Sequence, residues 1–535
     1  MITSPELDPV ELPGQEPGKD ISSLFGPMPR TLGPAQRLSE SPLWNRQRRF
    51  YDRDATDIWG SGSVPHGITC NPRIANTYAR IVLELLRTAG GDPTAVDRLH
   101  LVELGGGTGR FAYLLVRQLR ELAPGLPFTY VVTDFAADRV ATWAAHPSYR
   151  PLIEQGWIDF AVLDGDRPGS LELAISGRTI SANSLTGPVI GIANYVFDTL
   201  RHDCYAVRGG DLQEVRVAVG DVPTTEPFGT VEPTIVWEPT PLGPVPDDVR
   251  EVLDQYAETL DDTAVLAPVG AMRCLDFLAG LTCGPAFALV ADKGHATPLE
   301  LCSLQAPSVV YHGSAFSLMV NFDFLSRWVR GRGGVAVLPS EPARSLVVGA
   351  FAFGAVADPQ QLTCSVRDQL LDVGPDNFFA VRTFLGEASA GSLDAMLASL
   401  RLSRFDPTLL VELLPALLDV LPGVSEPERA EVERVLRRVW DNYFPIGEPI
   451  DMALCLGLLH AAIHRFPAAI GFLERSVTEH PDSAPAAFSM AVAHRGLRDL
   501  RTAQVWVERA LVLDPAFSEA RTLRAVLADD LGLGV

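Results

Sequence analysis

The sequence predicts an α/β domain with a Rossmann-like, doubly wound sheet, followed by an all-α domain. Apolar, β-branched runs alternate with helix-like segments over the first two thirds of the chain, and strand-like runs disappear after about residue 400. The glycines Gly105, Gly107 and Gly109 follow the apolar run Leu101–Leu104 and precede a helical segment, Phe111–Leu122. A strand, a glycine turn and a helix in this order open a nucleotide-binding α/β unit.

The composition bounds the domain organisation and the class of partner. A chain of 535 residues predicts two or three domains. We assign residues 1–40, rich in Pro, Gly and acidic residues, to a flexible arm, residues 41–385 to the α/β domain and residues 400–535 to the helical domain. A net charge of −22 argues against binding to nucleic acid, and no apolar run reaches the length of a membrane span. Seven scattered cysteines without a C-x-x-C pair indicate a reducing cytoplasm and no metal site.

The glycine turn is the first candidate for cofactor binding. Its spacing is not the dinucleotide pattern G-x-G-x-x-G, because position 110 is Arg110. The segment Glu103–Gly109 reads E-x-G-x-G-x-G and resembles motif I of class I S-adenosylmethionine (SAM) methyltransferases. We therefore expect the four glycines of the turn to hold the cofactor; these glycines are Gly105, Gly106, Gly107 and Gly109. Glu103 is expected to bind the cofactor through its methionine amino group or to orient the turn. The simpler alternative is a glycine-rich turn without a ligand.

Two acidic residues follow the next strand-like runs. Phe128–Thr133 is followed by Asp134, and Trp157–Leu163 is followed by Asp164. An acid at the end of the second strand of a doubly wound sheet binds ribose hydroxyls, so we expect Asp134 in that role. Asp164 is a candidate to meet the adenine amino group. The alternative for Asp134 is the N-cap of the following helix.

A fourth strand-like run, Pro188–Ala193, leads to the candidate catalytic residues. In this fold the residues just after the fourth strand face the transferred methyl group, so we expect Asn194, Tyr195 and Asp198 at the reaction site. Asn194 is also a cofactor candidate. The alternative for Asp198 is a helix cap. Aromatic residues within 41–70 could form a lid over the site, although we favour simple packing on the α/β domain.

Six segments in one order resemble the MidA family of SAM-dependent methyltransferases, which includes the mitochondrial complex I assembly arginine methyltransferase. The segments are Gly67–Pro72, Glu103–Gly109, Asp134, Asn194–His202, Ala291–Gly294, and His312 together with Val320–Phe322. The resemblance implies SAM as cofactor and adds His312 as a weaker catalytic candidate.

Two departures concern the acceptor. Tyr195 and Asn321 stand where the family has acidic residues. A guanidinium acceptor needs carboxylates to orient it and balance its charge. The departures therefore weigh against arginine as the acceptor, whereas the residues expected to bind SAM are intact.

The last third of the chain repeats at an offset of 34 residues. Ala469 matches Ala503, and the pairs Glu474-Arg475 and Glu508-Arg509 share the same offset. This pattern resembles tetratricopeptide repeats, about two units followed by a final helix, Glu519–Leu531. Stacked helices of this kind bind a peptide or protein in a groove. The alternative is a structural cap or a homodimerisation element.

The leading hypothesis is a cytoplasmic SAM-dependent methyltransferase whose repeats recruit a protein or peptide substrate. A second hypothesis is a non-catalytic scaffold that keeps the methyltransferase fold. A third is a small-molecule biosynthetic methyltransferase, in which the repeats hold a carrier domain or stabilise an oligomer.

Overall fold

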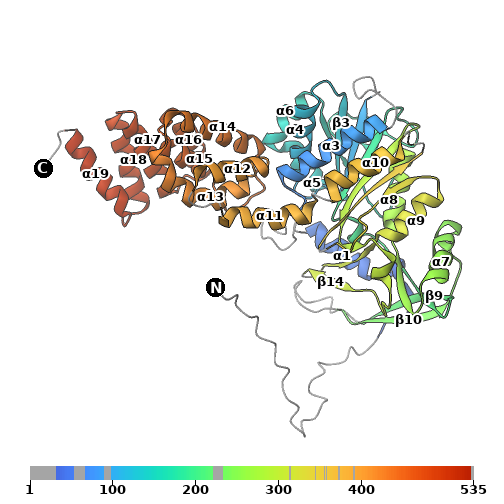
Figure 1. The fold of residues 1–535 in the computed structure, drawn as a ribbon. Coiled ribbons are helices and arrows are strands. Elements are labelled where there is room, and N and C mark those ends of the chain that lie inside the picture. Colours follow the sequence, from blue (N-terminus) through green and yellow to red (C-terminus); the bar gives the residue numbers. More distant parts are fainter. Residues whose placement is uncertain are drawn as a thin grey trace, which may run out of the picture.

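The computed structural model contains an α/β domain with an elongated helical domain beside it (Figure 1). It describes residues 32–53, 67–88, 98–220, 233–312, 315–343, 345–354, 356, 358–371, 374–388 and 392–531. No helix in this described part is both long enough and apolar enough to cross a membrane.

A seven-stranded sheet forms the centre of the α/β domain. Its strand order is β17 (Val335–Val337), β18 (Val347–Phe353), β12 (Ala286–Asp292), β7 (Val189–Asn194), β2 (Leu99–Leu104), β3 (Phe128–Asp134) and β4 (Ile158–Val162). The five strands from β12 to β4 are parallel, while β18 is antiparallel to both of its neighbours. Every residue of β2, β3 and β12 is buried, as the apolar composition of these strands requires in a sheet covered on both faces. The predicted doubly wound sheet is present.

Helices cover both faces of this sheet (Figure 1). The first face packs against α3 (Pro72–Thr88), α4 (Arg110–Leu122), α5 (Ala137–Ala145) and α10 (Pro359–Val366). The second packs against α7 (Asp247–Thr259), α8 (Val269–Gly280) and α9 (Phe322–Gly331). Strand order reverses at β2, because β3 and β4 lie on one side of it and β7 and β12 on the other.

A second, antiparallel sheet is inserted between β7 and β12. It contains the hairpin of β8 (Asp203–Arg208) and β9 (Asp211–Val219), together with β10 (Ile235–Pro241) and β11 (Thr263–Ala267). Its core also takes in α1 (Leu43–Arg53) and the hairpin of β14 (Val309–His312) and β15 (Ala315–Leu318). This sheet holds α1 close to the carboxyl ends of the central strands.

The expected arm of residues 1–40 needs a correction at its end. Residues 1–31 lie outside the described part of the chain, but residues 32–40 are folded. Strand β1 (Gln36–Arg37) pairs with β9, and Leu38 in the following 3-10 helix η2 (Leu38–Glu40) is buried in the core of the second sheet. The prediction of flexibility was wrong for residues 32–40, because these residues pair and pack with β9, which is far away in the sequence.

The C-terminal domain consists of helices, as predicted. Its core begins at α12 (Leu393–Leu402), preceded by α11 (Pro375–Ala388), and continues through α13 (Pro407–Val420) and α14 (Glu426–Asn442). Two helix pairs follow, α15 (Met452–Ala462) with α16 (Phe466–Glu479) and α17 (Ala484–Gly496) with α18 (Leu500–Leu513), and then α19 (Ser518–Asp530).

The 34-residue sequence offset is repeated in the structure. Helices α16 and α18 begin and end 34 residues apart. Ala469 and Ala503 are fully buried at equivalent positions, as are Leu473 and Val507. Gly457 of α15 lets this helix approach α16 closely, since a Cβ atom at that position would lie 2.6 Å from the Leu473 side chain.

The two domains are joined by an aromatic contact. Phe444, between α14 and α15, is buried against Tyr113, His146 and Tyr149 of the α/β domain. Arg110, directly after the glycine turn, donates hydrogen bonds to the Phe444 carbonyl at 3.0 and 2.8 Å. The helical domain is therefore attached to the same helix that carries the glycine turn.

Candidate functional site

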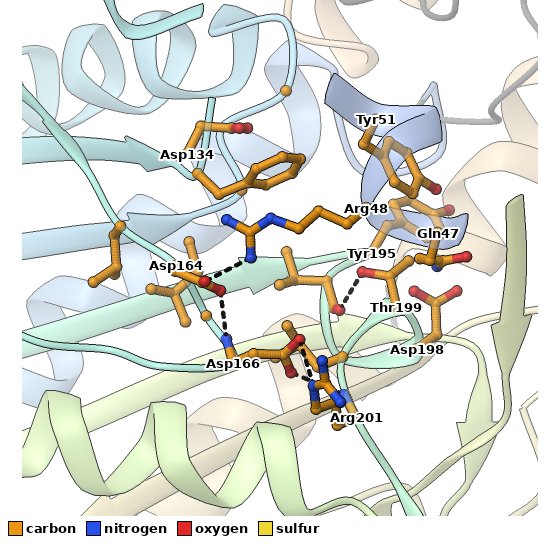
Figure 2. Close-up of a pocket in the computed structure, with 18 of the residues that line it drawn as sticks. Gln47, Arg48, Tyr51, Asp134, Asp164, Asp166, Tyr195, Asp198, Thr199 and Arg201 are labelled. Carbon is orange, nitrogen blue, oxygen red and sulfur yellow. Dashed lines mark hydrogen bonds and ion pairs between the residues drawn. The ribbon is translucent and has the colours of Figure 1, made fainter. Parts of the chain in front are cut away.

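A cavity of about 160 Å³ opens where the strand order reverses (Figure 2). In open α/β sheets, ligands bind at this point, beyond the carboxyl ends of the strands. Its lining comes from residues that follow β2, β3, β4 and β7 and from helix α1. Five predicted site residues besides the glycines lie together here: Asp134, Asp164, Asn194, Tyr195 and Asp198.

The glycine turn contributes two of its four glycines to the cavity wall. Gly105 and Gly107 line the cavity with φ values of +61° and +54°, which residues with a side chain rarely adopt. Gly106 and Gly109 are not in the lining. A side chain at Gly106 would meet Val132 at 2.3 Å, and one at Gly109 would meet the Tyr149 hydroxyl at 2.8 Å. These two glycines let the turn pack against the first face of the sheet, so their role is structural.

Glu103 lies behind the turn rather than in the lining. As an inward-facing residue of β2 it is 4% exposed, and its Oε2 has no hydrogen-bond partner among the described residues. Burial raises the pKa of Glu103 to about 8. We expected this carboxylate to contact the cofactor or to orient the turn. Glu103 is not in the cavity lining, and its expected role in orienting the turn stays a prediction.

Asp134, at the end of β3, lines the cavity but already has partners. Its Oδ2 accepts a hydrogen bond from Arg139 Nη1 at 2.6 Å, and its Oδ1 accepts one from the Ala136 amide at 3.0 Å. Arg139 also donates to the Tyr51 carbonyl of α1 at 3.0 Å. Asp134 therefore does not cap α5 itself, since the N-cap residue of that helix is Ala136.

Asp164 follows β4 and receives the side chain of Arg48 from α1. The Arg48 Nη1 to Asp164 Oδ2 distance is 2.6 Å, and the guanidinium lies 5.0 Å above the centre of the Phe135 ring. Figure 2 shows Arg48 reaching from α1 across the cavity to this carboxylate. A planar, positively charged group is thus stacked on an aromatic ring and paired with an acid within the cavity.

A third aspartate in the lining, Asp166, was not predicted from the sequence. Its carboxylate accepts hydrogen bonds from the Arg201 amide at 3.1 Å and from Arg201 Nε at 3.2 Å. Asp166 and Arg201 belong to the loops after β4 and β7, so no local sequence pattern connects them.

Asn194 and Tyr195 stand at the end of β7. The Asn194 Oδ1 accepts a hydrogen bond from the Tyr78 hydroxyl of α3 at 2.9 Å, while its buried Nδ2 has no partner among the described residues. Tyr195 has φ +56°, an uncommon value for a residue with a large side chain. Strained backbone of this kind concentrates at functional sites.

Asp198 and Asp292 form a buried carboxyl pair. The Asp198 amide donates to Asp292 Oδ2 at 3.1 Å, and the Lys293 amide donates to Asp292 Oδ1 at 2.9 Å. Asp198 is 5% exposed and Asp292 is fully buried. Burial raises the pKa of Asp198 to about 7, and burial together with the charge of Asp198 raises the pKa of Asp292 well above its usual range. Asp198 lies within the short helix η4 (Phe197–Thr199), so it is not a cap.

Helix α1 forms one wall of the cavity, which the local sequence pattern did not predict. Trp44 packs against the ring of His202, with 6.2 Å between ring centroids, and its indole N–H donates to the Leu38 carbonyl at 2.7 Å. Gln47 and Tyr51 line the cavity from the same helix. We favoured simple packing for the aromatic residues within 41–70; Trp44 and Tyr51 pack and also line the cavity, while Trp59 lies outside the described residues.

His312 is the last residue of β14, where it pairs with Ala315. Its side chain lies outside the described part of the chain, so its predicted role stays a prediction.

Comparisons with known proteins give limited similarity. No protein-family model matches the chain. Over 107 residues, 20% of the chain, it is 34% identical to the non-reducing polyketide synthase dpmpA of Macrophomina phaseolina, and it spans about 5% of that protein's length.

Two solved structures from Burkholderia thailandensis, both of the COG1565 superfamily, match the chain at low similarity. The first is 15% identical, with 64% of this chain and 91% of that chain covered and a TM-score of 0.39. The second, a candidate methyltransferase bound to S-adenosyl-homocysteine, is 16% identical, with 54% and 79% covered and a TM-score of 0.36. TM-scores this low carry no argument about function, which we therefore base on the geometry of the cavity.

Proposed function

We propose that the cavity binds SAM and that the protein is a SAM-dependent methyltransferase. The observation that carries the proposal is the position of Asp134 and Asp164. These two carboxylates follow adjacent strands, β3 and β4, beside a glycine turn and at the point where the strand order reverses. This arrangement suits a nucleoside, whose ribose hydroxyls and base amino group donate hydrogen bonds to carboxylates.

The remaining lining residues fit the rest of that cofactor. Gly105 and Gly107 leave room for a ligand to approach the backbone of the turn, and the unpaired Nδ2 of Asn194 offers a hydrogen-bond donor. When bound, the cofactor would supply an electrophilic methyl group for transfer to a nucleophile.

The Arg48 side chain would have to move out of the cavity for the cofactor to bind. The cavity of about 160 Å³ is smaller than the range of about 300–1,000 Å³ typical of small-molecule sites. Arg48 crosses the cavity and holds Asp164, and Arg139 holds Asp134. Since Arg48 is about half exposed, its side chain can move into solvent at little cost.

We further propose that the helical domain recruits a protein or peptide that carries the acceptor. The 34-residue offset between α16 and α18 supports the interpretation as tetratricopeptide-like repeats. The attachment at Phe444 and Arg110 leaves α15–α19 projecting away from the sheet (Figure 1).

A small-molecule acceptor is the second candidate, favoured by the buried carboxyl pair. A non-catalytic scaffold is the alternative if methyl transfer is absent with every acceptor.

Titration calorimetry with S-adenosylhomocysteine tests the cofactor site. We expect micromolar binding to the intact chain and at least tenfold weaker binding for Gly107→Arg and Asp134→Asn. Asp138→Asn, an exposed position on α5, is the matched control and should bind as the unaltered protein does. Circular dichroism would establish that each variant is folded. No binding to the folded, unaltered chain would refute the proposal.

A further inference from the structure

Only one aspartate in the cavity lining is without an arginine partner. Asp134, Asp164 and Asp166 are each paired with an arginine, namely Arg139, Arg48 and Arg201 in that order. The fourth, Asp198, is buried in a wall that contains Lys293 and Ser317. Its Oδ1 is buried and has no hydrogen-bond partner among the described residues. A buried carboxyl oxygen without a partner is costly unless a ligand satisfies it.

A second unsatisfied group lines the same end of the cavity. Gln47 is 3% exposed; its Oε1 accepts a hydrogen bond from the Phe316 amide at 2.8 Å, while its Nε2 has no partner among the described residues. Figure 2 shows Gln47, Tyr51 and Asp198 at one end of the cavity, with Asp134 and Asp164 at the other. An amide donor and a carboxyl acceptor without partners among the described residues therefore lie at the end of the cavity away from Asp134 and Asp164.

Asp292 is the acidic neighbour with which Asp198 shares a proton. It is fully buried, at the end of β12, and both of its oxygens accept backbone amides. Two buried carboxyls in hydrogen-bond contact cannot both ionise easily, so one proton stays on the pair near neutral pH. The other titratable groups facing Asp198 are Lys293, which favours its ionised form, and the phenols of Tyr51 and Tyr195.

We infer that Asp198, backed by Asp292, is the proton acceptor for a neutral acceptor group of the oxygen- or carbon-acid type, such as a phenol or an enolisable carbonyl. This inference rests on the proposed methyl transfer and narrows its acceptor. Gln47 is a positioning residue that donates a hydrogen bond to the acceptor's oxygen. A guanidinium acceptor is disfavoured, because Arg48, Arg139, Arg201 and Lys293 already line the cavity.

The reaction step balances without any further reagent. The acceptor X–H gives its proton to Asp198 Oδ1, and the electron pair of that bond forms the new X–C bond to the methyl group. The S–C bond breaks at the same time, and its electron pair stays on the sulfur. The carboxylate becomes a carboxylic acid while the positive charge on the sulfur disappears, and the proton afterwards leaves to solvent. A base whose pKa lies near the working pH suits this task.

Infrared difference spectroscopy on the protein alone provides the first test. In the unaltered protein the protonated-carboxyl band should lose intensity near pH 7, from Asp198, and again near pH 8, from Glu103, and only the transition near pH 7 should disappear in Asp198→Asn. Asp254→Asn, an exposed aspartate paired with Arg250, is the matched control and should leave the transition in place. An unchanged transition in Asp198→Asn would overturn the inference.

Methyl transfer from labelled SAM provides the second test. The probes are N-acetyltyrosinamide as a phenol, acetylacetone as a carbon acid and N-acetylargininamide as a guanidinium. We expect transfer to the phenol or the carbon acid, and about a 10²–10⁴-fold lower kcat in Asp198→Asn with S-adenosylhomocysteine affinity unchanged. In Asp292→Ala the rise of kcat with pH should move to higher pH, because the Asp292 side chain lowers the pKa of Asp198 by hydrogen bonding, and loss of packing alone would not produce this shift. Transfer to the arginine probe, or full activity of Asp198→Asn, would contradict the inference.

The two proposals fail in different ways. Absence of S-adenosylhomocysteine binding with an intact Asp198 titration would remove the methyltransferase assignment, and with it the role of Asp198 in methyl transfer, but would leave Asp198 as a carboxyl that titrates near neutral pH. Cofactor binding without a carboxyl titration that depends on Asp198 would remove the proton acceptor alone.

Discussion

The carboxyl groups at the two ends of the cavity have different partners. At one end Asp134, Asp164 and Asp166 are each paired with an arginine, while at the other Asp198 and Asp292 lie beside each other, backbone amides, Lys293 and Ser317, with no arginine partner among the described residues. A paired carboxylate is satisfied in the free chain and has to exchange its partner when a ligand binds. A buried carboxyl group without an arginine partner, such as Asp198, holds a proton near neutral pH and can exchange it with a bound ligand. The difference separates a binding end from a reacting end within one cavity.

The largest effect should come from breaking the buried pair at the binding end. Arg139→Met leaves Asp134 buried without its countercharge, and removal of one partner of a buried pair costs about 3–5 kcal/mol of unfolding free energy. Chemical denaturation measures this loss. Arg250→Met, which breaks the exposed pair with Asp254, is the control and should cost about 0.2–1 kcal/mol. Equal losses in the two variants would show that burial does not distinguish these pairs.

Glu103 extends the comparison, because it too is a buried carboxyl without an arginine. Its pKa of about 8 lies above the value of about 4.3 in an unfolded chain, so the folded state binds more protons between these pH values. Stability contributed by this group is therefore lost as pH rises, by at most about 1.4 kcal/mol per pH unit in that window. Glu103→Gln should remove this slope and make the variant more stable than the unaltered protein at pH 8.

Denaturation at pH 5 and pH 8 measures the slope. Glu121→Gln, a half-exposed carboxylate of α4 paired with Arg438, is the control and should keep the slope of the unaltered protein. Asp198, whose pKa is also raised, keeps part of the slope in both proteins, so only a slope in Glu103→Gln as steep as that of the unaltered protein would contradict the prediction.

The sequence predicted the binding end better than the reacting end. Asp134 and Asp164 each end an apolar run, and parallel strands bring such ends to one edge of the sheet. Asp292 lies 94 residues from Asp198, and no spacing rule joins the two before the strands are paired. Gln47 and Arg48 reach the cavity only because α1 packs on an inserted antiparallel sheet that has no counterpart in the local pattern.

The glycine turn also shows that local sequence does not determine which residue faces the cavity. Its four glycines appear equivalent in the sequence, yet Gly105 and Gly107 face the cavity while Gly106 and Gly109 make room for Val132 and Tyr149. Local spacing identifies a turn. Which residue faces a ligand depends on the helices that pack behind the turn.

The smallest effect concerns Arg48, the exchangeable partner at the binding end. Its pair with Asp164 is partly exposed, and such pairs contribute about 0.2–1 kcal/mol, to which stacking on Phe135 adds about 0.5–1 kcal/mol. If the cofactor has to displace this side chain, Arg48→Ala should bind S-adenosylhomocysteine about 3–10-fold more tightly, measured by calorimetry, since 1.4 kcal/mol corresponds to tenfold. Arg49→Ala, on the exposed side of the same helix, is the control and should leave the affinity unchanged. Weaker binding in Arg48→Ala would instead make Arg48 part of the bound site, and the binding end would then resemble the reacting end in using its charged side chain on the ligand.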